Sequence, residues 1–100
     1  MISRQWRGVA KNSDADRYVD HLRTETFPQL SRIAGFIGAS ILRRTVAGGV
    51  EFRIVTTWNS IEAIERFAGE RPDTAVVPEQ VQAMMVTYDR TVDHYEVVEC

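Results

Sequence analysis

The segment FIGASILRRTVAGGVEFRIVTTW, from Phe36 to Trp58, decides the fold of this chain. β-Branched and aromatic residues, which favour strands, are frequent in both halves of the segment. Gly48-Gly49 lies between the halves, and glycine accepts the positive φ angles of a tight turn without steric cost. The segment therefore predicts a β-hairpin with strands at Phe36–Arg44 and Val50–Trp58.

Both predicted strands carry apolar residues at odd and at even positions. Because side chains alternate between the two faces of a sheet, this pattern indicates a sheet that is covered on both faces. An uncovered face would expose a larger apolar patch than monomers usually carry. We therefore expect helices on one face and a second copy of the chain, in a twofold homodimer, on the other. The residues concerned are Phe36 and Leu42 against Ile37, Ala39 and Ile41, and Val50, Phe52, Ile54 and Trp58 against Val55.

The region before the hairpin predicts a strand and a helix. Residues Ile2–Ala10 alternate β-forming and polar residues, which is typical of a strand. Asn12-Ser13-Asp14 is a cluster of helix-capping residues. Apolar residues then recur at steps of three and four, Pro28 is expected to kink or restart the helix, and Gly35 to end it. The residues on the apolar face are Ala15, Tyr18, Val19, Leu22, Thr26, Leu30 and Ile33.

The region after the hairpin predicts a broken helical stretch and a last strand. Asn59-Ser60 caps a helix that ends at Gly69, and the following residues 70–77 are irregular. Pro78 begins a further helical piece with Val81, Met84 and Met85, and Thr91–Val98 is the last strand. The order is βαββαβ. Because crossovers are right-handed, it predicts an α+β, ferredoxin-like domain over residues 1–100 with a four-stranded antiparallel sheet.

Composition excludes several classes of protein. With 44% hydrophobic and 26% charged residues, the 100-residue chain is typical of one globular domain. A net charge of −2 provides no field for nucleic acid or an anionic membrane, and no apolar stretch has the length of a membrane span. Cys100 is the one cysteine, so it has no partner for a disulfide or a thiolate metal site. We therefore expect a cytoplasmic protein without nucleic-acid or membrane partners.

Several runs along the chain together resemble the antibiotic-biosynthesis-monooxygenase-like family. The resemblance implies a dimeric α/β barrel. Some members of the family oxidise polycyclic phenols to quinones with O₂ and without metal or flavin, and others degrade haem. The ordered set of runs carries the resemblance: the first strand with Trp6, the passage Val55–Ser60 leading into Ile61-Glu62-Ala63, the segments Phe67–Glu70 and Ala75–Pro78, and the closing run His94–Val97.

Two departures from the family pattern bear on activity. By resemblance, the haem-degrading branch has an Asn on the first strand, a Trp near the end of the second helix and an iron-binding His after it. At the corresponding positions this chain has Trp6, Phe67 and Val77. An aliphatic side chain cannot bind iron, so the resemblance does not extend to haem degradation. The cofactor-free monooxygenases often place Asn and Trp on the second helix, where this chain has Ala63 and Phe67. A non-catalytic dimeric module that binds a small ligand therefore remains the alternative.

His94 is the candidate catalytic residue. The ordinary pKa of a histidine lies near neutrality, so His94 could act as a general base and take the phenolic proton of a substrate, whose anion then reacts with O₂. A strand histidine that merely satisfies a hydrogen bond is the other interpretation. His21 lies off the apolar helix face and is expected in solvent. Neither histidine has the spacing of a metal site.

Trp6, Trp58 and Phe67 are the candidate walls of a pocket for a flat aromatic compound. Arg4 has the same parity as Trp6 and could hold an anionic group of that compound. The aromatic residues could equally be ordinary core. Our leading hypothesis is a cofactor-independent monooxygenase that acts on a small aromatic or quinol compound.

Overall fold

The hairpin forms as predicted and makes one edge of an antiparallel sheet. In the computed structural model, which describes residues 1–100, β2 (Phe36–Val46) and β3 (Gly49–Trp58) are joined by a turn at residues 47–48. Gly48 has a φ of 85°, which glycine adopts without strain. β1 (Ile2–Ala10) pairs antiparallel with β3 along its whole length and forms the centre of the sheet.

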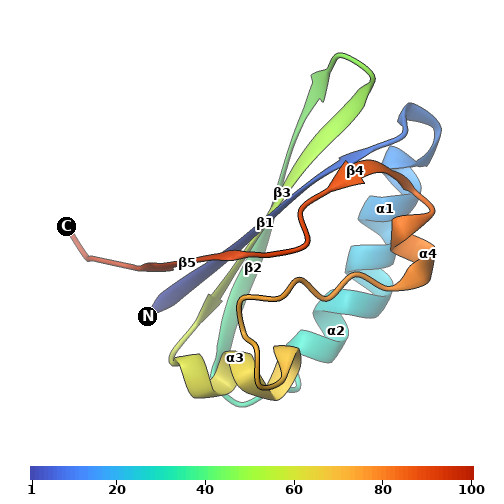
Figure 1. Ribbon diagram of the computed structural model, residues 1–100. Helices are drawn as coiled ribbons and strands as arrows, with labels where there is room; N and C mark the ends of the chain where they lie inside the picture. Colours follow the sequence, from blue (N-terminus) through green and yellow to red (C-terminus); the bar gives the residue numbers. More distant parts are fainter.

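Two short strands, rather than one, occupy the far side of β1. β4 (Met85–Tyr88) pairs with the end of β1, and β5 (Asp93–Glu96) pairs with its beginning (Figure 1). The predicted strand at Thr91–Val98 is confirmed at its centre by β5, whereas β4 was not predicted as a strand. Between β4 and β5 the chain leaves β1, because the Val92 N–H donates to the Asp73 carbonyl at 2.8 Å. The strand order β2-β3-β1-β4 confirms the predicted α+β, ferredoxin-like class.

A bulge in β2 separates apolar residues that the sequence places on the same parity. Phe36 pairs with Trp58, but Gly38 pairs with Thr57, so Ile37 is an extra residue in the ladder. Phe36 therefore contacts the helix-side core, whereas Leu42 lies on the opposite face and is 53% exposed. The outer face is consequently less apolar than the alternating pattern indicates.

The helices lie together on one face of the sheet (Figure 1). α1 (Ala15–His21) continues through a π-helical turn at Leu22–Thr26 into α2 (Phe27–Leu30). The π turn precedes Pro28, and the helix is not interrupted there. The predicted apolar face is confirmed by the burial of Ala15, Tyr18, Leu22 and Leu30. The predicted capping residues 12–14 form a 3-10 turn instead and provide no side-chain cap.

The second helical region is partly as predicted. α3 (Ile61–Ala68) is capped by Ser60, whose Oγ accepts from the Ala63 N–H at 3.2 Å. α4 (Glu79–Gln82) is a single turn, so the prediction of helix at Met84 and Met85 is wrong. Met85 pairs with Ala10 in the sheet, and this pairing buries it as effectively as a helix would. The sequence therefore predicted the burial of Met84 and Met85 correctly, but their spacing from Val81 wrongly indicated a helix.

The core consists of two clusters rather than one. The larger cluster surrounds Phe52 and Tyr18, and the smaller one surrounds Trp58 and Leu30. Both lie between the sheet and the helices. No helix of the chain combines the length and the apolar character that a membrane crossing requires.

Candidate functional site

A cavity of about 80 Å³ lies between the sheet and the helices. Its lining includes members of both core clusters, so it occupies the place where the core divides. Arg4 is the one charged residue of the lining, and most of the others are apolar. The lining residues are Arg4 and Trp6 of β1, Ile54 and Thr56 of β3, Tyr18, Leu22, Thr26 and Leu30 of the first helix, Phe67 of α3, the segment Val76–Pro78, Val81 and Val92.

Arg4 is buried without a carboxylate partner. Its side chain and backbone are together only 5% exposed, and it forms no ion pair. Nη1 donates to the Pro72 carbonyl, and Nη2 donates to the Thr74 carbonyl at 3.0 Å. The ring of Phe67 lies 5.7 Å from the guanidinium carbon. Burial lowers the pKa of Arg4 to about 10, because the charged form has lost its water, while the charge of Asp73 opposes this shift.

His94 lies beside Arg4 but is not part of the cavity lining. Its Nε2 is 3.1 Å from Nη1 of Arg4, and the two residues are directly opposite in the β1–β5 ladder. A guanidinium only donates, so Nε2 accepts, which places the imidazole proton on Nδ1. Burial lowers the pKa of His94, and the neighbouring charge of Arg4 lowers it further. The imidazole is therefore held neutral with its lone pair directed at Arg4.

Trp6 lines the cavity and is fixed from three sides. Its indole Nε1 donates to the Asp89 carbonyl at 2.7 Å, and its ring lies 6.3 Å from Tyr18 and 6.4 Å from Tyr88. The indole also covers Gly8, where a β-carbon would come within 2.6 Å of Cη2. Gly8 therefore gives the indole the space in which it lies. The sequence reasoning missed this role of Gly8, although a glycine inside a strand signals the close approach of another group.

Phe67 lines the cavity, whereas Trp58 supports it from behind. Trp58 is fully buried, outside the lining, and stacks on Phe67 with ring centroids 6.2 Å apart. Its Nε1 donates to Thr56 Oγ1 at 2.9 Å, so the polar atom of the indole is satisfied inside the protein. Of the predicted pocket residues, Arg4, Trp6 and Phe67 therefore meet at the cavity, and Trp58 belongs to the core next to it.

Tyr18 is a polar member of the lining that the sequence reasoning treated only as core. It is 3% exposed, and its hydroxyl makes no hydrogen bond with the protein. Burial raises the pKa of the phenol, so the hydroxyl keeps its proton. The signal that could have identified it is a tyrosine on an apolar helix face, because its hydroxyl needs a partner.

The roof of the cavity is the segment between α3 and α4, residues 70–78. Besides the two bonds from Arg4, the Ala75 N–H donates to the Arg90 carbonyl at 2.9 Å, and Thr74 bridges to Thr91. The residues between β4 and β5 thus hold the roof in place, which is why the last strand is interrupted. This irregular segment supplies Val76–Pro78 to the lining.

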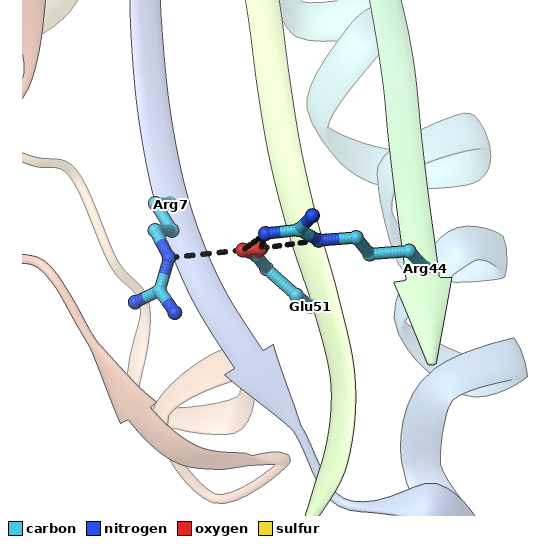
Figure 2. A network of polar contacts seen from close by, with 3 residues as sticks. All are labelled: Arg7, Arg44 and Glu51. Atoms are coloured by element: carbon cyan, nitrogen blue, oxygen red, sulfur yellow. Dashed lines mark hydrogen bonds and ion pairs between the residues drawn. The ribbon is translucent and has the colours of Figure 1, made fainter. Parts of the chain in front are cut away.

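The outer face of the sheet carries a charged ladder, and the shallow pocket beside it is lined mainly by charged side chains. Glu51 of β3 lies between Arg7 of β1 and Arg44 of β2, with Nε of Arg7 at 3.2 Å and Nη2 of Arg44 at 2.9 Å (Figure 2). The hydrogen bonds from Arg44 and Arg7 lower the pKa of Glu51. Ile37, Leu42 and Tyr95 are exposed large apolar residues of the sheet. The outer face is therefore mixed in character.

The sequence matches no family model and no curated protein. Solved structures resemble the chain over nearly its full length. A Bacillus cereus protein with the provisional name antibiotic biosynthesis monooxygenase has a TM-score of 0.67 at 18% identity, and the match covers 100% of this chain and 95% of that one. A Bordetella bronchiseptica protein with the same provisional name has a TM-score of 0.67 at 13% identity, covering 98% and 97%.

The haem degrader MhuD of Mycobacterium tuberculosis, with two haems bound in its active site, has a TM-score of 0.61 at 18% identity. The match covers 100% of this chain and 98% of that one. The chain has the fold of antibiotic-biosynthesis-monooxygenase-like proteins, as the resemblance in its sequence implied.

Proposed function

We propose that the chain is a member of the antibiotic-biosynthesis-monooxygenase-like family that oxidises a small aromatic or quinol compound with O₂, without metal or organic cofactor. The observation that carries this proposal is the composition of the cavity: one buried cation, Arg4, in a wall that is otherwise apolar and aromatic. Such a wall accepts a flat ring, and a cation in a water-poor site stabilises the anion that must form before O₂ reacts.

In this scheme Arg4, Trp6 and Phe67 bind the substrate. The aromatic rings contact the substrate ring, and Trp58 keeps Phe67 in position by stacking on it. The Arg4 charge attracts an anionic oxygen more strongly than an exposed arginine would, because few water molecules screen it. The protein thereby favours the anionic form of the substrate.

His94 is the proposed proton acceptor. Its pKa is lowered, so at neutral pH the imidazole is the free base that this role requires. Its Nε2 lone pair is directed at Arg4, so it becomes available to a substrate hydroxyl when the Arg4–His94 hydrogen bond opens. The substrate anion then transfers electrons to O₂. One oxygen atom enters the substrate as a carbonyl oxygen while the substrate gives up two hydrogen atoms, and the other oxygen atom leaves with these two hydrogens as water.

Haem does not fit the residues of this cavity. The lining contains no histidine or cysteine, and Val77 lies in the roof at the position where the family pattern has the iron-binding residue. His94 is outside the lining and its Nε2 is engaged by Arg4. We therefore derive no role for haem in this chain.

We also propose that two copies associate through the outer faces of their sheets. Leu42 and Tyr95, which the register places on the outer face, are each about half exposed in the single chain, and a second copy would cover them. Sedimentation equilibrium at micromolar concentration should give about twice the chain mass of 11.4 kDa. Leu42→Glu should shift this mass towards one chain, whereas Val76→Glu, at a similarly exposed valine of the roof, should not. A wild-type mass of one chain would contradict the dimer.

The alternative is a non-catalytic module that binds a small ligand. The position of His94 outside the lining favours it, because a base should touch the reacting group. An oxygen electrode distinguishes the two: a one-ring hydroquinone should consume O₂ faster with protein than in buffer alone. His94→Gln should reduce this rate at least tenfold, and the control His21→Gln should not change it. Ligand binding without any protein-dependent O₂ uptake would favour the module.

A further inference from the structure

We infer that the compound bound in the cavity is a monocarboxylate with an apolar body no larger than a single ring, and that its carboxylate is the counterion of Arg4. The inference rests on the proposed function only in taking the cavity as the ligand site. It adds the charge, the chemical group and the size of the ligand.

The charge of the ligand follows from the environment of Arg4. Buried arginines are normally paired with a carboxylate, because an uncompensated charge in an apolar interior is costly. Arg4 is 95% inaccessible and yet has only backbone carbonyls and the neutral His94 as partners. Asp73 influences Arg4 at a distance but forms no ion pair with it. The guanidinium therefore has no carboxylate in direct contact with it, and a ligand can supply one.

The donors that remain on Arg4 suit a carboxylate. Nη1 donates to Pro72 and faces His94, and Nη2 donates to Thr74, but Nε has no partner in the protein. Every fully buried side-chain nitrogen of the chain has a hydrogen-bond partner. Because Nε of Arg4 has none, it is not fully buried and can be reached from the cavity or the solvent. Nε and the second N–H of Nη2 form a planar fork that matches the two oxygens of a carboxylate. Binding there leaves the contact with His94 intact.

The single positive charge also limits the ligand to a monoanion. No second cation lines the cavity, so a phosphate ester, with close to two negative charges, would bring one charge that nothing compensates. A neutral ligand would leave Arg4 without a counterion. A monocarboxylate satisfies both conditions.

The size of the cavity limits the apolar body. At about 80 Å³ it is smaller than the engineered cavity of about 150 Å³ that admits benzene in another protein. A one-ring body therefore already requires a small outward shift of the roof, residues 70–78. A polycyclic body would require the roof bonds from Arg4 and Ala75 to open, so we place the ligand at the one-ring limit.

Calorimetric titration with benzoate, benzamide and phenyl phosphate tests this inference on the wild-type chain. Benzoate should bind at least about tenfold more tightly than either of the others, because a charge-assisted hydrogen bond contributes about one order of magnitude or more. Arg4→Gln should abolish the preference for benzoate over benzamide. Arg7→Gln, at an arginine of the outer face, should preserve it. The wild-type comparison stands even if Arg4→Gln fails to fold.

Equal or tighter binding of benzamide or phenyl phosphate would overturn the inference, as would a preference for benzoate that survives Arg4→Gln. If the protein accelerates O₂ uptake with a neutral phenol but does not bind benzoate, the inference is wrong, whereas the proposed function is supported. Selective benzoate binding without any O₂ uptake would support the inference and count against the enzyme.

Discussion

The indole of Trp6 lies directly over Gly8, and a β-carbon at Gly8 would come within 2.6 Å of the ring atom Cη2. Both residues are on the helix side of β1, where Trp6 is opposite Ile54 and Gly8 is opposite Phe52. Because Gly8 has no side chain, the indole of Trp6 has room to lie against the strand, where it forms a wall of the cavity.

Gly8→Ala should change the cavity because it displaces Trp6. The indole must move away from the new methyl group, which breaks its hydrogen bond to Asp89 and narrows the ligand space. We expect a loss of about 1–3 kcal/mol in unfolding free energy, the range for overpacked sites, and weaker ligand binding. Denaturant unfolding and tryptophan fluorescence measure both. Adding Trp6→Phe should recover part of the stability, because the smaller ring avoids the clash.

Gly38→Ala is the matched control for this experiment. A β-carbon at Gly38 would meet nothing within 4 Å, and this glycine is also inside a strand. If Gly38→Ala and Gly8→Ala had equal effects on fluorescence and binding, the role assigned to Gly8 would be wrong.

The lowered pKa of His94 should make stability depend on pH near neutrality. The ordinary value for the unfolded chain is 6.5, and the folded chain binds the proton less readily. Between these two pKa values the unfolded chain binds more protons than the folded chain. The contribution of His94 to the free energy of unfolding is therefore fully present above pH 6.5 and is lost as the pH falls towards the folded pKa. Melting temperatures from about pH 7.5 to about pH 5.5 should decrease more for wild type than for His94→Gln. An identical decrease in both would contradict the neutral state assigned to His94.

Tyr18→Phe should separate ligand binding from stability. Its hydroxyl has no partner in the protein, so its removal should change the free energy of unfolding by no more than about 1 kcal/mol. Affinity for a ring with a hydroxyl substituent should fall, while affinity for the unsubstituted ring should not, because only the former has a group to pair with Tyr18. A large loss of stability would instead show that the hydroxyl has a structural role.

Glu51→Gln should destabilise the chain at neutral pH and much less in acid. The pKa of Glu51 is lowered from an ordinary value of 4.5, so its ionised form stabilises the fold above that value, and this contribution is lost as the pH falls through the lowered pKa. The gap in melting temperature between wild type and variant should therefore shrink between about pH 7 and about pH 3. Glu70→Gln, at an exposed position of the roof, should show no such gap.

Local patterns were sufficient for the elements whose signals lie within a few residues. The hairpin turn needs the small residues at 47–49, and α3 needs the cap at Ser60, so both formed as predicted. Alternation in β1 also placed Arg4 and Trp6 on one face, and periodicity placed Phe67 on the sheet side of α3. These three residues line the cavity for this reason.

Contacts between distant segments required the folded chain. Arg4 bonds to Pro72, Thr74 and His94, which follow it by 68, 70 and 90 residues, and no local pattern encodes such pairings. The bulge at Ile37, the interruption between β4 and β5 and the strand at Met85 likewise depend on what lies opposite in the sheet. Propensity and periodicity act over about one turn or one strand, whereas the hydrogen-bond partner of a buried group is set by packing across the whole molecule.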